Sequence, residues 1–158
     1  MDAILFGFRA QVDVKGKLAE LYLYHHLQKL EKDGVITKLE WLDEDGKPDF
    51  YFICNGKSYR LECKNVRNEM YQTPTPAYKV EIQRTRNSKD GTNTRSYRID
   101  YFDILAICTF NQSKQWKFYF IHVSDLETVE GNTSLLKIMQ RVPLTPQNQW
   151  TDNLNALL

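Results

Sequence analysis

The dipeptide Asn55-Gly56 is the feature of this 158-residue chain that most constrains its fold. It stands between two apolar segments, and Asn-Gly is the strongest short-range signal for a two-residue type I′ hairpin turn. Two strands are therefore predicted, one from Asp49 to Cys54 and one from Lys57 to Lys64. A two-residue turn also sets the register, because Cys54 then faces Lys57 and every further pair follows by counting outward.

In this register one face of the hairpin is apolar with a period of two residues. Its members are Phe50, Phe52, Cys54, Tyr59, Leu61 and Cys63. On the opposite face Asp49 stands directly across from Glu62, and Lys64 follows Glu62 on the same row. Two carboxylates so placed have Cβ atoms about 5 Å apart, which normally destabilises a sheet. An ion pair of Asp49 with Lys47 or Lys64 at a solvated sheet end is the structural explanation. A shared divalent cation is the functional one.

A helix is predicted upstream, from just after Gly16 to about Lys32, where Asp33-Gly34 ends it. Apolar and aromatic residues recur there with the period of a helix. They are Ala19, Tyr22, Leu23, His26, Leu27 and Leu30. Glu20 lies at the edge of this stripe, so its carboxylate is expected to turn partly toward whatever the helix packs on.

The remaining elements indicate a single α/β domain over residues 1–158, with a mixed central β-sheet flanked by helices. Further strands are predicted at Ile36–Leu42, Lys79–Thr85, Phe102–Phe110 and Trp116–His122. The segment Tyr71–Pro76 is expected to be a loop because each X-Pro step disfavours helix and removes a donor, and Asn87–Asn93 is expected to be a turn. Short helices are predicted at Ser134–Arg141 and Thr151–Leu158.

Composition narrows the class of protein further. Hydrophobic residues make up 42% and charged residues 26%, as in ordinary globular domains, and only 7 glycines and 5 prolines are present. No run approaches the roughly 20 apolar residues of a membrane span. Three cysteines, Cys54, Cys63 and Cys108, lie far apart in apolar segments, which predicts reduced thiols and a cytoplasmic protein.

The distribution of charge is more informative than the net charge of +1. Residues 78–98 hold six cations and two anions, whereas residues 1–47 hold seven cations and nine anions. A basic segment in an otherwise acidic chain is expected where a polyanion contacts one face, and a solvated loop is the alternative. The candidate DNA-contacting residues are Lys79, Gln83, Arg84, Arg86, Lys89, Arg95, Tyr97 and Arg98. For Gln83, a place beside the active centre and an ordinary strand position are both open.

The hairpin residues also carry a family resemblance. Pro48-Asp49, followed after twelve residues by Glu62-Cys63-Lys64, resembles the PD-(D/E)xK motif of the restriction-endonuclease-like nucleases. Gly16-Lys-Leu-Ala-Glu20 is similar to the first-helix glutamate of archaeal Holliday-junction resolvases. The resemblance covers about residues 16–110 and implies a restriction-endonuclease-like core. Beyond Lys64 the chain looks more like restriction- or homing-type members.

The chemistry of the residues agrees with this resemblance. Asp49, Glu62, the Cys63 backbone carbonyl and Glu20 offer hard oxygen ligands suited to Mg²⁺, with Mn²⁺ as a substitute. Such a metal coordinates the scissile phosphate and lowers the pKa of the attacking water. Lys64 is expected to hold that water or to stabilise charge in the transition state. Asp49, Glu62, Lys64 and Glu20 are therefore the predicted catalytic residues.

The resulting expectation is a Mg²⁺-dependent DNA endonuclease that hydrolyses phosphodiester bonds, with sequence-specific restriction-type cleavage preferred. Cutting both strands needs two active sites, hence a homodimer or a larger symmetric oligomer. A homing endonuclease, a structure-specific resolvase-like nuclease and a catalytically inactive DNA-binding module of the same fold are the alternatives.

The basic segment generates a first prediction. Substituting Arg84 and Arg86 with Ala should weaken DNA binding, and the salt slope of the affinity should fall by about one unit for each of the two arginines that binds a phosphate. If either arginine reads a guanine edge, about 1–3 kcal/mol of discrimination should vanish at one base position. Fluorescence anisotropy over a salt series measures both quantities. Unchanged affinity in the double variant would mean that the segment is a solvated loop.

Overall fold

The computed structural model describes residues 8–44, 46–84 and 95–158, with side chains from residue 14 onward. The predicted turn Asn87–Asn93 and two predicted DNA contacts, Arg86 and Lys89, lie outside the described residues.

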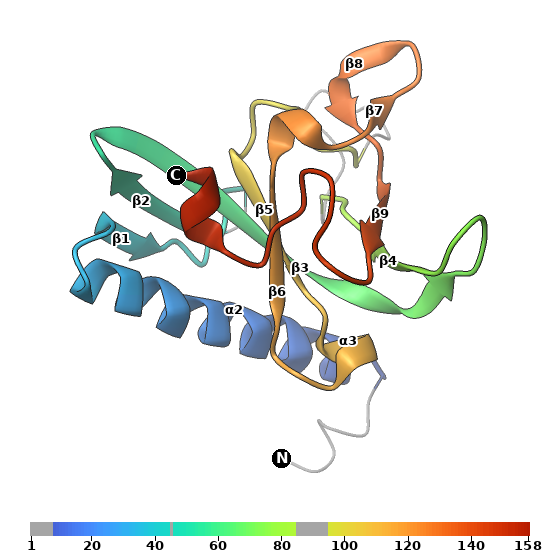
Figure 1. Cartoon of the computed structure of the whole chain (residues 1–158), viewed down its shortest axis with the longest axis horizontal. Helices are drawn as coiled ribbons and strands as arrows, with labels where there is room; N and C mark the ends of the chain where they lie inside the picture. The colour runs from blue at the N-terminus through green and yellow to red at the C-terminus, as the bar shows by residue number, and fades with distance from the viewer. Residues whose placement is uncertain (1–7, 45, 85–94) are drawn as a thin grey trace.

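A long helix packs against a mixed β-sheet in the described part of the chain (Figure 1). The helices are α2 (Phe8–Lys32), α3 (Phe110–Ser113) and two 3₁₀ turns, η1 (Val123–Asp125) and η2 (Leu154–Leu157). The strands are β1 (Thr37–Trp41), β2 (Phe50–Cys54), β3 (Lys57–Tyr71), β4 (Ala77–Glu81), β5 (Ile104–Cys108), β6 (Phe118–His122), β7 (Thr128–Val129), β8 (Asn132–Leu136) and β9 (Met139–Pro143). Seven of these strands form the main sheet, and β7 pairs with β8 in a small separate one.

The β2–β3 hairpin has the predicted register. Cys54 pairs with Lys57, Phe52 with Tyr59 and Phe50 with Leu61. Both turn residues have positive φ, 51° at Asn55 and 77° at Gly56, as a type I′ turn requires. The apolar face is buried as expected, with Phe50, Phe52 and Leu61 at 0% exposure.

Strand β3 is the central element of the sheet and runs to Tyr71, seven residues beyond the predicted end at Lys64. It pairs antiparallel with β2 and β4 and parallel with β5, so the predicted mixed sheet is confirmed. The remaining neighbours extend the sheet at its margins, because β1 pairs with β2, β9 with β4 and β6 with β5.

Two hydrophobic clusters cover opposite faces of this sheet. One packs α2 through Ala19, Leu23, Leu27 and Leu30 onto the apolar face of the hairpin, which confirms the predicted stripe at those positions. Tyr22, also assigned to the stripe, is 44% exposed and stacks on Trp116. The helix begins at Phe8, earlier than predicted.

The second cluster lies on the face away from α2. It joins the strand residues Val66, Val80, Leu105 and Val142 with residues from the irregular segments of the chain. Those residues are Tyr97, Phe102, Leu126 and Trp150. Cys54, Cys63 and Cys108 are free and buried, and no helix in the described residues is long and apolar enough to cross a membrane.

The predicted helix Ser134–Arg141 is wrong, because this segment forms the end of β8 and the start of β9. Its apolar residues fit a helical period, but β9 pairs with β4 and buries Gln140 and Val142 with a period of two. Tertiary pairing therefore overrides local propensity. The predicted helix Thr151–Leu158 is reduced to the 3₁₀ turn η2, and the link between β5 and β6 contains α3.

The central position of β3 generates a second prediction. Leu61→Ala should lower the free energy of unfolding by about 2–5 kcal/mol, because Leu61 is fully buried between the helix and the sheet. Leu144→Ala is the control, since Leu144 is 36% exposed and should change stability by less than about 1 kcal/mol. Urea titration measures both, and equal effects would contradict the placement of Leu61.

Candidate active site

The predicted catalytic residues Glu62 and Lys64 lie on β3 between the stretches that pair with β2 and with β4. The pairs with β2 end at Leu61, and the pairs with β4 begin at Val66. Between these points the described pairing of β3 is with β5 alone. One edge of β3 therefore has no strand partner among the described residues along positions 62–65, and we call it the open edge.

Asp49 occupies this open edge. It directly precedes β2, and its Oδ2 accepts a hydrogen bond of 2.8 Å from the backbone N–H of Cys63. Of the two lysines expected as alternative partners of Asp49, Lys47 lies 3.0 Å from Glu44, whereas Lys64 interacts electrostatically with Asp49. The N–H and C=O of one residue point to the same edge of an extended strand, so the Cys63 carbonyl oxygen shares the edge with the Asp49 carboxylate.

Glu62 is 5% exposed, an unusual degree of burial for a carboxylate. Burial raises the pKa of Glu62 well above its ordinary value, and the adjacent Asp49 carboxyl raises it further, while Lys64 opposes both effects. This agrees with the prediction from the register that Asp49 and Glu62 face each other. The two carboxyl groups are held together at an electrostatic cost.

Glu20 comes to the same region from α2, and its carboxylate is turned partly inward as predicted. Its Oε1 accepts a hydrogen bond of 3.0 Å from the indole N–H of Trp41, and Lys17 lies 3.8 Å from its Oε2. Burial, and then repulsion by Asp49, raise the pKa of Glu20 to about 7. The carboxyl groups of Glu20, Asp49 and Glu62 thus influence one another electrostatically.

Lys64 lies on the same face of β3 as Glu62. Its Nζ is 5.4 Å from the ring centroid of Tyr97. Burial alone would lower the pKa of Lys64, but the Tyr97 hydroxyl and the Glu62 carboxylate raise it above its ordinary value. The lysine is a half-buried cation beside the buried Glu62 carboxylate.

The donor set fits a divalent cation only in part. In the described part of the chain, no three Asp, Glu, His or Cys side chains form a group that could hold a metal ion. Asp49 and Glu62 with the Cys63 carbonyl oxygen are hard donors on one open edge, as Mg²⁺ prefers. A cation there would cancel the repulsion that raises the pKa of Glu62. Glu20 is instead engaged by Trp41 and Lys17.

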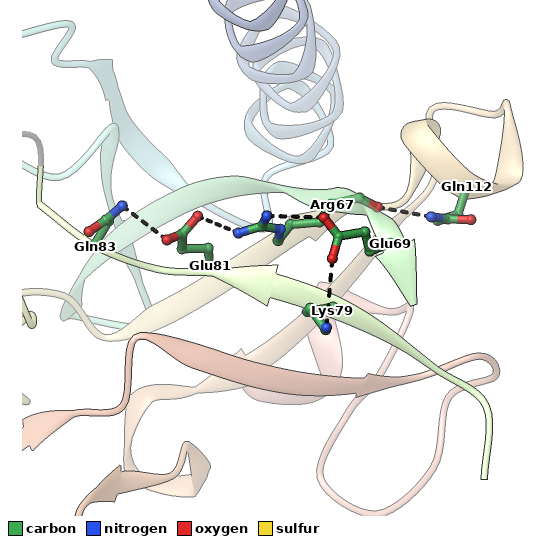
Figure 2. Close-up of polar contacts among 6 residues, drawn as sticks. All are labelled: Arg67, Glu69, Lys79, Glu81, Gln83 and Gln112. Atoms are coloured by element: carbon green, nitrogen blue, oxygen red, sulfur yellow. Dashed lines mark hydrogen bonds and ion pairs between the residues drawn. The ribbon is translucent and has the colours of Figure 1, made fainter. Parts of the chain in front are cut away.

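Two predicted DNA-contacting residues belong to a polar network on β3 and β4 (Figure 2). Arg67 lies between two carboxylates, 2.8 Å from Glu81 and 3.3 Å from Glu69. Gln83 donates to Glu81 at 3.1 Å, and Lys79 lies 4.0 Å from Glu69. Gln112 of α3 donates to the Arg67 carbonyl at 3.0 Å. Lys79 and Gln83 are therefore already engaged within the protein.

The arginines of the basic segment are placed differently. The Arg84 N–H donates to the Arg95 carbonyl at 2.7 Å, which ties the two chain segments together. Arg95 and Arg98 are exposed, and Arg98 lies 3.4 Å from Asp100. Tyr97, between them, is 5% exposed and faces Lys64 instead of solvent.

Tyr101 is a site residue that the sequence analysis missed. Burial, and then the Glu62 carboxylate, raise the pKa of Tyr101 to about 12, whereas Arg84 lowers it. Its ring lies 5.0 Å from that of Tyr97. A tyrosine near a basic segment was the available signal, but nothing in the sequence linked it to the carboxylates. The Asp103 carboxylate accepts a hydrogen bond of 2.7 Å from the Arg60 backbone N–H.

The helix, the hairpin and the long central strand form a mixed α/β fold, in which paired carboxylates and a lysine lie together. The solved structure of a bacterial homing endonuclease, I-Ssp6803I, is similar to this chain, with a TM-score of 0.52 and 19% sequence identity. The match covers 71% of this chain and 69% of that one. No protein-family model and no curated protein matches the sequence. The likeness concerns the fold, and membership of the PD-(D/E)xK family stays a prediction.

The carboxyl groups of Glu62 and Glu20 generate a third prediction. It applies to the metal-free protein, in a buffer that contains a chelator. A carboxyl whose pKa is raised on folding stabilises the fold least above that pKa, so Glu62 and Glu20 should reduce stability as the pH rises from about 5 to about 8. Glu62→Gln should therefore raise the melting temperature at about pH 8, by roughly 2–4 °C for each kcal/mol of repulsion removed. The gain should shrink at about pH 5.

Thermal unfolding followed by circular dichroism measures this dependence. Glu40→Gln is the control, because Glu40 is exposed on β1 and should not show a pH-dependent gain. An equal gain for Glu62→Gln at both pH values would contradict the carboxylate repulsion.

Proposed function

We propose that this chain is a metal-dependent DNA endonuclease that hydrolyses phosphodiester bonds. The observation that carries the proposal is the meeting of Asp49, Glu62 and Lys64 at the open edge of β3, beside the Cys63 carbonyl. The fold similarity to a homing endonuclease supports the class of substrate. Arg84, which like Glu62 influences Tyr101, and the exposed Arg95 and Arg98 suit a phosphate backbone.

Each residue has a role in this mechanism. Asp49, Glu62 and the Cys63 carbonyl would hold Mg²⁺, which when bound supplies phosphate coordination and activation of the attacking water. Lys64 keeps its positive charge where negative charge develops on the phosphate. Glu20 places a second carboxyl group near Asp49. Its hydrogen bond from Trp41 joins α2 to β1 at this side of the site.

Restriction-type, sequence-specific cleavage of both strands by a homodimer or a larger symmetric oligomer is the form we favour. A two-fold axis would set one site on each strand. Homing-type cleavage is the second candidate, and the fold similarity to I-Ssp6803I favours it specifically. A cut-site map on long sequenced DNA separates the two, because a short recognition site is cut often and a long one rarely.

Plasmid cleavage with Mg²⁺, with Mn²⁺ and with a chelator is the direct test and the fourth prediction. Glu62→Gln and Lys64→Ala should each lower the cleavage rate by about 100-fold or more, since each removes charge at the reacting phosphate. Metal-free DNA affinity should be unchanged or slightly higher in Glu62→Gln, because this variant has one negative charge fewer.

Lys57→Ala is the matched control for Lys64→Ala. Lys57 lies on the same strand and also packs over a tyrosine ring, 5.1 Å from the Tyr59 centroid, but at the hairpin turn. Its variant should cleave at the wild-type rate. Metal-dependent cleavage that survives both Glu62→Gln and Lys64→Ala would overturn the site.

A further inference from the structure

Tyr97 is fixed in place by the chain on every side. Its carbonyl accepts a hydrogen bond of 2.8 Å from the Leu136 N–H, and the next residue, Arg98, bridges to Leu135. Its ring packs edge-on against Phe102, with centroids 5.7 Å apart, and beside Tyr101 at 5.0 Å. Tyr97 is 5% exposed, and its packed side chain forms one side of the site.

The Lys64 side chain needs a fixed neighbour of this kind to hold its position. A lysine has a flexible four-carbon stem and a compact charge, so by itself it holds no single position. Its Nζ lies 5.4 Å from the Tyr97 centroid, within the roughly 6 Å range of a cation–π interaction. The Tyr97 hydroxyl also interacts favourably with the ammonium group.

Glu62 completes the arrangement from the other side. It lies two residues before Lys64 on the same face of β3, and its carboxylate attracts the Lys64 ammonium. Without Tyr97 this attraction would draw the lysine toward the carboxylates. With Tyr97 the ammonium is held between a ring and a carboxylate, and its position is defined from two directions.

We propose that Tyr97 is a positioning residue that holds the Lys64 ammonium at the reacting phosphate. The inference rests on the proposed nuclease function and deepens it, because it assigns to Tyr97 a role inside the site instead of a contact with the DNA surface. Misplacement of a catalytic group by about 1 Å can cost about 100-fold in rate, so a flexible lysine gains much from this support.

The hairpin holds a second lysine–tyrosine pair that serves as a control. Lys57 lies 5.1 Å from the centroid of Tyr59, and Tyr59, like Tyr97, is 5% exposed. Tyr59 packs against Phe52, with centroids 5.5 Å apart, on the face that α2 covers. Tyr59 therefore matches Tyr97 in burial and in its cation contact but is not part of the site.

The test, our fifth prediction, compares conservative variants of the two tyrosines in plasmid cleavage. Tyr97→Phe keeps the ring and loses the hydroxyl, and should lower kcat by about 10-fold. Tyr97→Leu loses both and should lower kcat by about 100-fold. KM and metal-free DNA affinity should stay within about twofold, because Lys64 is placed for the transition state. Tyr59→Phe should keep the wild-type kcat.

A double-mutant cycle with Lys64→Ala shows whether Tyr97 acts through the lysine. If it does, Tyr97→Phe should have no further effect on kcat in the Lys64→Ala background. Equal kcat values for Tyr97→Phe, Tyr59→Phe and the wild type would overturn the inference, as would fully additive effects in the cycle. Failure of the nuclease function itself looks different, because the wild-type protein would then cleave no DNA with any metal.

Discussion

The hydrogen bond from the Cys63 N–H to the Asp49 carboxylate is the interaction on which the rest of the site depends. It stands where β3, paired with β5 on its other edge, has no described strand partner between Leu61 and Val66. A buried backbone N–H without a partner costs about 1–3 kcal/mol, so the carboxylate stabilises the place where the sheet opens. The same bond fixes Asp49 beside Glu62 and beside the Cys63 carbonyl. A structural requirement of the sheet and the geometry of a candidate active site are thus met by one contact.

The carboxyl groups of the site lie where their charges lower the stability of the metal-free protein. Glu62 and Glu20 both have raised pKa values because burial and a neighbouring carboxylate oppose their ionisation. Lys64 and Lys17 offset part of this cost, and Trp41 donates to Glu20. A sequence selected for stability alone would not place carboxylates together in a buried position, since violations of this kind concentrate at functional sites. The cost becomes understandable if a divalent cation and a phosphate occupy the open edge.

The parts of the structure that the sequence predicts are those that local rules determine. The Asn55-Gly56 turn defines the hairpin register as far as Phe50 opposite Leu61, and Asp49 and Glu62, the next residues outward, lie beside each other. The contact of Tyr97 with Lys64 joins positions 33 residues apart and depends on how β8 holds residues 97–99. The extension of β3 to Tyr71 and strand β9 likewise depend on pairing with β4, and β8 depends on pairing with β7, which no local pattern reveals. Their strand partners, and not the residue types themselves, determine where these strands form and end.

The described cations of the basic segment differ in the contacts that they make within the protein. Lys79 is held by the Glu69 carboxylate and the Tyr71 ring, so DNA would have to compete with contacts that the fold already makes. Arg84 instead lowers the pKa of Tyr101, which the Glu62 carboxylate raises. The Arg84 backbone N–H also donates to the Arg95 carbonyl. The planar guanidinium group of an arginine can bind a phosphate or a guanine edge with two hydrogen bonds. Among the described arginines, Arg95 and Arg98 are exposed on either side of Tyr97, which is turned inward to Lys64.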